Sequence, residues 1–571
     1  MVRKTRFAGV LGFILCAALL SGLVPAFAQG ASLEPVNITI AWNEQWADTS
    51  NNPYWPNQVA QYVAERTGVR IDIMGMDDEK LKVLIAGRDL PDMVFMAAST
   101  HISQLIEGNS VIPLDDLLET NGPDIQKNAS DMLALLRKYS DYGTGKLYVL
   151  SNETGPALPP AGASSTGYQL RWDLYKELGC PEFKTNEELV AILKQMHDLY
   201  PETDEGKPVY AVGTQNEWHN QGLWGYKVNG FSEGWWETNT PGYSYAMGGD
   251  REIINNYTNL DGPFWRRINF MYLCDKEGLL DPDTFTMTVG DYDAKMKAGQ
   301  YLYDMIAFWT PGFYREEALR DPGSIRGFQM IPFEGGSVWD NAMYYSGFGK
   351  LWTITTNAKA PERCMDLLNY LFTPEFARVR YCGFQGVQWD VIDGVPQMLP
   401  LAWDQRLDTD LWNKEIGLDS TWQFSGLNTG FIGPDGYPSS LWANITPHND
   451  AKANEMLTAC DRDYMAYYGL TKKYDIVEKA IADGKMIDAS QTIILPLPSP
   501  PDDIMFIDSN LDIIAVKAIP KLVKAKDNAE YQEVQAKMLD DMKAAGIEDS
   551  EKWWFDTYYQ LLQGYKDALG L

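Results

Sequence analysis

Residues 36–76 read "VNITIAWNEQWADTSNNPYWPNQVAQYVAERTGVRIDIMGM", and their pattern sets the fold class. The first seven residues alternate between apolar and polar as a half-buried strand does. Residues 57–68 place apolar side chains at helical spacing and end in Gly68, a helix-stop signal. Residues 69–76 then alternate as a second strand. A strand, a helix and a strand in this order form a βαβ unit, which predicts an α/β protein.

Helices and strands continue to alternate along the chain. Residues 78–96 predict a helix, a break and a short buried strand, and residues 104–120 predict two helices about a turn. A helix is predicted over 185–201, with Thr185 and Glu188 at capping-box spacing, followed by a strand over 207–213. Residues 297–313 predict a helix end, a strand and a loop. The proline cluster at 495–503 predicts an extended connection to a helical C-terminus.

Length and charge limit the possible classes of protein. At 571 residues the chain exceeds what one hydrophobic core organises, so two large lobes are expected. It carries 78 acidic and 48 basic side chains, a net charge of −30. Such a surface repels nucleic acid and anionic lipid, and it suits a soluble exported protein.

The N-terminus has the layout of a secretory signal peptide. Basic residues precede an apolar run that starts at Phe7 and ends in "AFA" at 26–28. We predict cleavage after Ala28 and an exported protein, periplasmic or at the extracellular surface. Cys16 follows Leu15 rather than a small residue, which argues against a lipobox. The alternative is an uncleaved anchor that holds the same domain outside the cell.

Cysteine and histidine usage predicts neither a disulfide scaffold nor a metal site. Five of the six cysteines lie beyond the predicted leader, an odd number without close pairs, so at most one or two bridges could form. The four histidines are scattered, and the chain has no HExxH or Cys-x-x-Cys motif. We therefore predict no metal and no cofactor.

Tryptophans in polar, Gly- and Asn-rich stretches are the unusual feature among 19 Trp and 31 Tyr. They occur in "WNEQWADTSNNPYW" (42–55), "TQNEWHNQGLWGYKVNG" (214–230) and "GFQGVQWD" (383–390). A ring beside amides and carboxylates suits a sugar, because the ring stacks on the C–H face while the polar groups bond the hydroxyls. Covering about 100 Å² of ring face contributes roughly 2.5 kcal/mol. Two or three such rings with hydrogen bonds approach the roughly 8 kcal/mol of micromolar binding. Core packing is an equal alternative for any single tryptophan.

Four segments carry a resemblance to a known family. They are residues 42–73, "LIAGRDLPDMVFM" (84–96), "LRWDLYKELGCPEFKTNEELVAILKQM" (170–196) and "TTNAKAPERCMDLLNYLFTPEFARVRYCGFQGVQWD" (355–390). Their order and spacing resemble the extracellular solute-binding proteins of oligosaccharide ABC importers, in the branch of large lipoprotein-type binders (family 1-like). The pattern PER…LLNYL…E followed by G-x-Q-G-x-x-W is the most specific part.

The resemblance implies a two-lobed periplasmic-binding-protein type II fold with a hinge and an interlobe ligand cleft. The implied order is a signal peptide (1–28), a first lobe (36–155), a second lobe (156–308) and a return to the first lobe or hinge (309–350). Next come a return to the second lobe with cleft loops (351–490) and a C-terminal extended connection with helices (491–571). The implied function is sugar capture, by hinge closure on an oligosaccharide that is delivered to the permease subunits. A monomer is expected.

The resemblance also implies which residues bind the sugar. Residues after the first strand would line the cleft from one lobe and the tryptophans of 214–230 from the other, with Trp309 close to the hinge. Arg171 and Asp92 fall in matched motifs, where a structural role is the alternative. The predicted binding residues are Trp42, Asn43, Glu44, Asp92, Arg171, Trp218, Trp224, Trp309, Gly386 and Trp389; no catalytic residue is predicted.

The chain departs from the pattern of alginate-type relatives, some of which carry a calcium loop after the helix that here ends near Tyr200. The sequence "PETDEGKPVY" (201–210) is too short for that loop and lacks its ligand series, so no calcium is predicted. The acidic surface also argues against a strongly anionic ligand. Two alternatives stay open: a secreted glycoside hydrolase, which would need two carboxylates about 5 to 10 Å apart, and a cell-surface lectin without a transporter. No Walker sequence is present.

Overall fold

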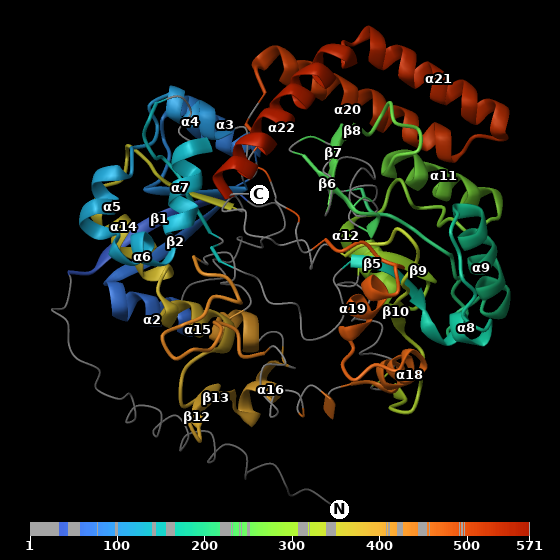
Figure 1. Cartoon of the computed structure of the whole chain (residues 1–571), viewed down its shortest axis with the longest axis horizontal. Helices are drawn as coiled ribbons and strands as arrows, with labels where there is room; N and C mark the ends of the chain where they lie inside the picture. The colour runs from blue at the N-terminus through green and yellow to red at the C-terminus, as the bar shows by residue number, and fades with distance from the viewer. Residues whose placement is uncertain are drawn as a thin grey trace, which may run out of the picture.

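The chain forms two α/β lobes, each with its own sheet and hydrophobic core (Figure 1). The computed structural model describes residues 34–43, 57–76, 78–97, 101–139, 144–152, 154–155, 166–216, 230, 232–238, 240, 242–247, 252–306, 318, 320–338, 350–406, 408, 411–418, 426–442, 451, 454–455, 457–489, 492, 495, 497–498 and 500–569. The predicted signal peptide and its cleavage site lie outside these residues. None of the helices among them has both the length and the apolar character that a membrane span needs.

The first lobe is built on a five-stranded sheet with the order β2-β1-β3-β11-β4. Strands β1, β2 and β3 are parallel, whereas β11 is antiparallel to both β3 and β4. The predicted βαβ unit is confirmed: the Asn57 side chain accepts from Ala60 N at 2.8 Å to begin α2, and Gly68 ends it at φ 69°. The strands are β1 (Val36–Asn43), β2 (Val69–Met76), β3 (Met93–Ala97), β4 (Leu150–Ser151) and β11 (Lys350–Ile354).

Helices from two distant parts of the chain cover this sheet. Helix α14 packs against α2, α5 and α6, which precede it by more than 200 residues. A short hairpin, β12 (Trp389–Ile392) with β13 (Val395–Met398), projects from the same lobe (Figure 1). The helices are α2 (Gln58–Thr67), α3 (Asp78–Gly87), α4 (His101–Glu107), α5 (Asp115–Asn121), α6 (Pro123–Asn128), α7 (Ser130–Tyr139), α14 (Pro361–Leu371), α15 (Pro374–Cys382), α16 (Pro400–Arg406) and the π-helix η2 (Leu411–Ile416).

The second lobe contains two three-stranded sheets. The first has the order β10-β5-β9 and the second the order β6-β7-β8, and all their pairings are antiparallel. The predicted capping box of Thr185 and Glu188 is present at the start of α9. The elements are β5 (Thr166–Arg171), β6 (Trp235–Glu237), β7 (Tyr243–Ala246), β8 (Ile253–Asn255), β9 (Tyr303–Ile306), β10 (Phe328–Met330), α8 (Trp172–Glu177), α9 (Asn186–Leu199), α11 (Pro263–Lys276), α12 (Val289–Lys297), α18 (Ala459–Tyr468) and α19 (Asp475–Ala482).

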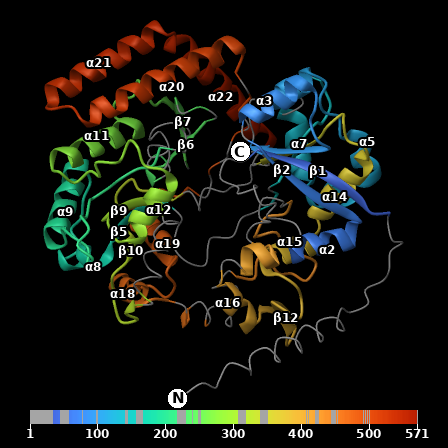
Figure 2. The same ribbon diagram turned by 180° about the vertical axis from the view of Figure 1, so that it is seen from behind.

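Three long helices end the chain, as the sequence predicts. They are α20 (Asp502–Val523), α21 (Asn528–Ala544) and α22 (Ile547–Leu569). Helix α20 packs on α11, and its buried residues belong to the core of the second lobe. Figure 2 shows α20 and α21 lying along the outside of that lobe, while α22 turns toward the first lobe.

The lobe boundaries and one strand differ from the sequence-based expectation. Strand β10 pairs with β5, so residues 321–338 belong to the second lobe instead of returning to the first. Residues 350–442 belong to the first lobe rather than the second, because β11 pairs with β3 and α14 and α15 complete the first core. The strand expected over 207–213 is reduced to isolated bridges, one of them at Pro208, which lacks the N–H that a ladder requires.

Candidate functional site

Five strand ends meet at one edge of the first lobe's sheet. Asn43, the last residue of β1, pairs with Met76 on one side and Met96 on the other. Lys350 begins β11 opposite the end of β3, and its backbone N and O bond the Oδ1 and N of Asn152 at 2.7 and 2.8 Å. In open α/β sheets ligands bind outside the carboxyl ends of the parallel strands. This edge is therefore the first lobe's candidate binding face.

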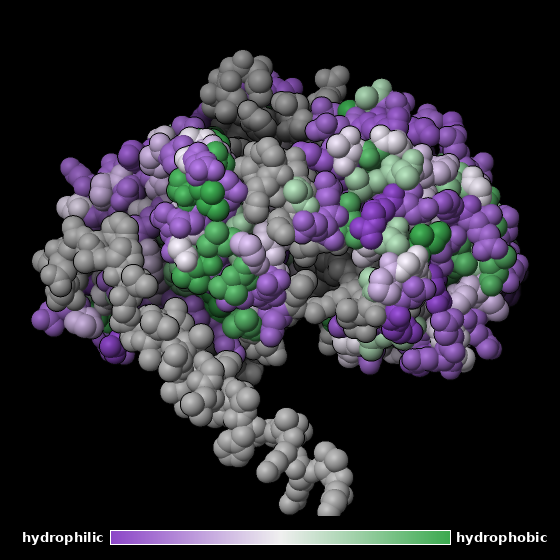
Figure 3. Space-filling view, turned by 90° about the horizontal axis from the view of Figure 1, so that it is seen from below, coloured by the Kyte–Doolittle hydropathy of each residue, from purple (hydrophilic) through white to green (hydrophobic). Residues whose placement is uncertain are grey.

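The second lobe presents a comparable edge where β5 begins and β9 ends. Thr166 pairs with Ile306, and β5 is the strand that follows β4 in sequence. Gly167 has φ 104°, and a Cβ there would come within 2.9 Å of Met330 Cγ, so this tight edge requires glycine. Figure 3 shows a hollow between the two lobes. The space between them is the candidate site.

Trp42 is a core residue of the first lobe. The strand register places Trp42, Phe95 and Trp352 in one row across β1, β3 and β11. Their ring centroids are 5.4 and 4.2 Å apart in succession, and all three side chains are fully buried. We predicted that Trp42 contacts the sugar. The structure gives it a packing role instead, because a fully buried ring has no face available to a ligand.

Asp92 and Arg171 have structural partners. Asp92 accepts from Thr39 N at 2.9 Å and from Lys359 N at 3.1 Å, which ties β1 to the turn after β11. Arg171 is fully buried, and its Nε and Nη2 bond both carboxylate oxygens of Asp173 at 3.0 and 2.8 Å. These contacts support a structural role for both residues, which was the alternative to sugar binding.

Trp389 lies in a tight turn at the base of the β12–β13 hairpin. Gly386, at φ 78°, donates its N–H to Trp389 O at 2.7 Å. The indole Nε1 donates to Gly383 O at 3.0 Å, and the Arg378 guanidinium lies over the ring at 5.0 Å from its centroid. The ring is half-buried with one face covered by a cation. A sugar stacking here would use the other face.

The remaining predicted contacts stay predictions. Asn43 ends β1 at the candidate edge, and its backbone is all that the structure describes of it. Glu44, Trp218, Trp224 and Trp309 lie outside the described residues.

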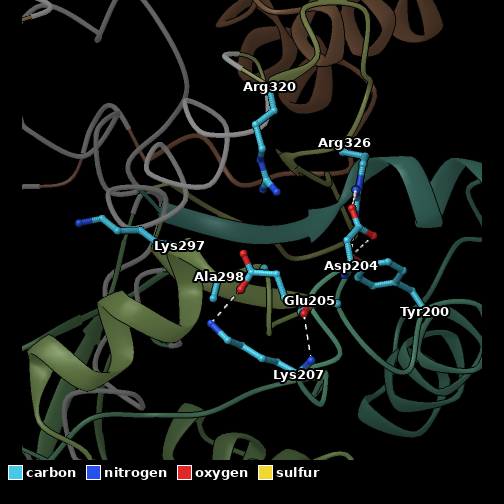
Figure 4. A pocket seen from close by; sticks show the side chains of 10 residues that line it. Tyr200, Asp204, Glu205, Lys207, Lys297, Ala298, Arg320 and Arg326 are labelled. Atoms are coloured by element: carbon cyan, nitrogen blue, oxygen red, sulfur yellow. Dashed lines mark hydrogen bonds and ion pairs between the residues drawn. The ribbon is translucent and has the colours of Figure 1, made fainter.

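A cavity of about 380 Å³ in the second lobe was not predicted from the sequence (Figure 4). It lies between the turn that follows α9, the end of α12 and the segment before β10. Its lining residues are Tyr200, Thr203, Asp204, Glu205, Lys207, Lys297, Ala298, Gly299, Arg320 and Arg326.

Arg326 connects two of the segments that line this cavity. Its Nη1 pairs with Asp204 Oδ2 at 2.6 Å, its Nη2 bonds the Tyr200 hydroxyl, and its guanidinium lies 5.0 Å from the Tyr200 ring centroid. Arg171 approaches the same ring, at 5.1 Å. The hydrogen bond from Arg326 holds the pKa of Asp204 below its usual value. Arg326 thus fixes the turn over 201–207, although it lies 122 residues from Asp204 in sequence. No local sequence motif predicts this pairing.

We expect the Arg326→Gln variant to lower the melting temperature of the second lobe by about 2 to 4 °C, the shift that corresponds to about 1 kcal/mol in a domain of this size. The effect is modest because Asp204 is more than half exposed and solvent screens the pair. Calorimetry measures the change. Lys207→Gln is the matched control, because Lys207 faces the same cavity through an exposed pair with Glu205. Equal melting temperatures for the two variants would contradict the role of Arg326.

The described residues contain no group of three or more His, Cys, Asp and Glu side chains arranged to hold a metal ion. What the arrangement offers is the strand ends of two sheets on either side of the hollow between the lobes. Such surfaces bind a polar ligand through hydrogen bonds and ring stacking.

Solved structures similar to this one cover nearly the whole chain. The ABC-transporter substrate-binding protein FusA of Streptococcus pneumoniae, in complex with kestose, matches 94% of this chain and 99% of its own at a TM-score of 0.58 and 14% identity. The alginate-binding protein AlgQ2, solved without calcium ion, matches 93% and 100% at 0.60 and 16%. A solute-binding protein of Bifidobacterium longum infantis, associated with an ABC transporter and described as binding HMO, matches 92% and 99% at 0.60 and 14%. No family model and no curated protein sequence matches the chain. The likeness confirms the two-lobed periplasmic-binding-protein fold that the sequence predicts.

Proposed function

We propose that this chain, which has the two-lobed fold of oligosaccharide-binding proteins, is the exported substrate-binding component of an ABC transporter for oligosaccharides. The observation that carries the proposal is the shared fold, which spans more than nine-tenths of this chain and of FusA and AlgQ2 alike. The structure of FusA is a complex with kestose, and AlgQ2 is named as an alginate-binding protein. The N-terminal leader, with cleavage after Ala28, would export the protein to the periplasm or the cell surface.

The sugar would bridge the two candidate edges. Asn43 and Glu44 would act from the first lobe, and Trp218 and Trp224 from the second, with Trp309 near the hinge and Gly386 and Trp389 at the rim. Ligand contacts that form only when both lobes are engaged favour the closed arrangement, so binding shifts the population toward closure. The closed form would be the one that the permease subunits recognise. Trp42, Asp92 and Arg171 would support the site by packing and hydrogen bonding.

A neutral oligosaccharide fits the charge of the chain better than a uronate chain does. At a net charge of −30, an anionic polymer would be repelled during approach unless a local basic surface offset that field. Binding of a neutral sugar depends instead on stacking and on hydrogen bonds. The protein would act as a monomer, without catalysis and without a cofactor.

The test is a titration of intrinsic tryptophan fluorescence in the chain of residues 29–571 with a panel of neutral and acidic oligosaccharides. We expect saturable quenching at micromolar sugar, with the sugar recovered intact on chromatography. Shortened products would instead indicate a glycoside hydrolase. A flat response to every sugar would refute sugar binding.

A single stacking tryptophan should account for much of the affinity. We expect Trp224→Ala to raise the dissociation constant tenfold or more, because losing about 100 Å² of ring contact costs up to roughly 2.5 kcal/mol. Trp265→Phe is the control, since Trp265 is buried in the core of the second lobe and its indole donates to Tyr257 O at 2.8 Å. Equal affinities for the two variants would remove Trp224 from the site.

A further inference from the structure

Helix α22 contacts both lobes. Its residues Trp554, Tyr558 and Leu562 share one hydrophobic cluster with β7 and β8 of the second lobe and with Leu135 of α7 in the first. Figures 1 and 2 both show α22 leaving α20 and α21 and reaching the side of the first lobe that carries α7. The lobes are therefore joined by packing as well as by the chain segments that cross between them.

The attachment of α22 to the second lobe is buried and polar as well as apolar. The Tyr243 and Ser550 hydroxyls are 2.7 Å apart, and Trp554 Nε1 donates to Asp508 Oδ2 of α20 at 2.9 Å. Asn255 Nδ2 donates to Glu551 at 2.9 Å. Ser550 and Trp554 are fully buried. Breaking such satisfied buried bonds is costly, so α22 moves with the second lobe.

The attachment of α22 to the first lobe is narrower. Among the described residues, Leu135 is the first-lobe member of the cluster, and Lys138 Nζ donates to Gly564 O at 3.1 Å. Both belong to α7, one turn apart. Because the contact on this side is small and that on the other side is extensive, a relative motion of the lobes is accommodated here.

We propose that the contact between α7 and α22 is a latch that stabilises the separated arrangement of the lobes. Closing the lobes would move α7 relative to α22, so the packing of Leu135 in this cluster and the bond from Lys138 to Gly564 oppose closure. The latch would set the population of the closed form before any ligand arrives. Its consequence for sugar affinity rests on the proposed function, whereas its consequence for the distance between lobes does not.

Leu135→Ala tests the latch. The distance between lobes is measured without ligand by pulsed spin-label spectroscopy, with labels at Glu65 of α2 and Glu277 after α11, both exposed. The labels are attached through an unnatural amino acid because native cysteines remain. We expect the variant to populate shorter distances than the wild type. If the wild type binds a sugar, the variant's dissociation constant should fall by about three- to tenfold, since less of the binding energy is used for closure.

Leu133→Ala is the matched control. Leu133 lies on the same helix and is 8% exposed like Leu135, but it packs into the first lobe's own core. Its loss should destabilise that lobe without changing the distance between lobes. A Leu135→Ala distance distribution identical to that of the wild type would overturn the latch. If no sugar binds the wild type, the proposed function fails while the distances still decide the latch.

Discussion

Replacing Lys473 by methionine is expected to destabilise the second lobe by about 3 kcal/mol, because it leaves a buried carboxylate without its counter-charge. Lys473 Nζ lies 2.6 Å from Asp461 Oδ1, and both side chains are 12% exposed. Gln329 Nε2 donates to the same oxygen at 3.0 Å. The other oxygen accepts from Thr458 N and Oγ at 2.9 Å and so begins α18. One carboxylate therefore connects α18 to β10 and to the turn before α19.

The pH dependence of this pair has a definite sign. Burial alone would raise the pKa of Asp461, but the Lys473 ammonium and the hydrogen bonds lower it to about 2. A pKa below that of the unfolded chain contributes stability that is present above about pH 4 and is lost as the pH falls toward 2. The difference between wild type and Lys473→Met should thus be full at pH 7 and should shrink in acid. Denaturant unfolding at several pH values measures it.

The control for this prediction is Lys479→Met. Lys479 pairs with Asp483 at 2.9 Å, but both side chains are nearly half exposed, so its loss should cost at most about 0.5 kcal/mol. The double variant Lys473→Met, Asp461→Asn should regain much of the lost stability, because no unpaired charge is then left behind. Similar melting temperatures for the two lysine variants would contradict the role of the buried pair.

Asp512→Asn is expected to act in the opposite direction and to stabilise the second lobe at pH 8 by about 2 kcal/mol. Asp512 accepts from the Tyr257 hydroxyl at 2.7 Å, and Asp508 lies one turn before it on α20. Burial raises the pKa of Asp512 to about 7, and the negative charges of Asp508 and Glu237 add to the shift. A shift of about three pKa units corresponds to roughly 4 kcal/mol, which we halve because the side chain is partly exposed to solvent.

The expected pH window follows from the raised pKa. Between about pH 4 and pH 7 the native state holds a proton that the unfolded chain has released, so stability falls as the pH rises through this range. The asparagine variant lacks this loss, so its advantage should grow from about pH 4 and reach its full size above about pH 7. Asp503→Asn, at an exposed position on the same helix, is the control. An advantage of Asp512→Asn that is equal at pH 5 and pH 8 would rule out titration as its cause.

Local signals predicted the elements of the fold well. The alternation in β1 and β2, the glycine stop after α2 and the capping box of α9 each depend on residues that are close in sequence, and each is present. The proline cluster before α20 also marks the start of the C-terminal helices correctly. Such signals act through the backbone conformation of a few residues, which sequence patterns report directly.

Long-range pairings could not be predicted in the same way. Strand β11 lies between β3 and β4 although about 250 and 200 residues, respectively, separate it from them, and its sequence pattern does not indicate which strands it pairs with. The same register carries Trp42 into the core, so an indole that opens a polar stretch became a packing residue. Arg326 likewise finds Asp204 only through the tertiary fold. Partner choice is decided by contacts between remote segments, and a single sequence does not record these.

The position of β11 has a consequence for the order in which the chain can fold as it is synthesised. Because synthesis starts at the N-terminus, β3 and β4 are made long before the strand that lies between them in the sheet. The first lobe cannot complete its sheet until residue 350 and the rest of β11 have been made, and contacts of such long range form slowly. The second lobe in turn waits for α18 to α22, which follow residue 458. Neither lobe can reach its native structure early, so under the proposed export the chain would remain unfolded enough for translocation until nearly all of it has been made.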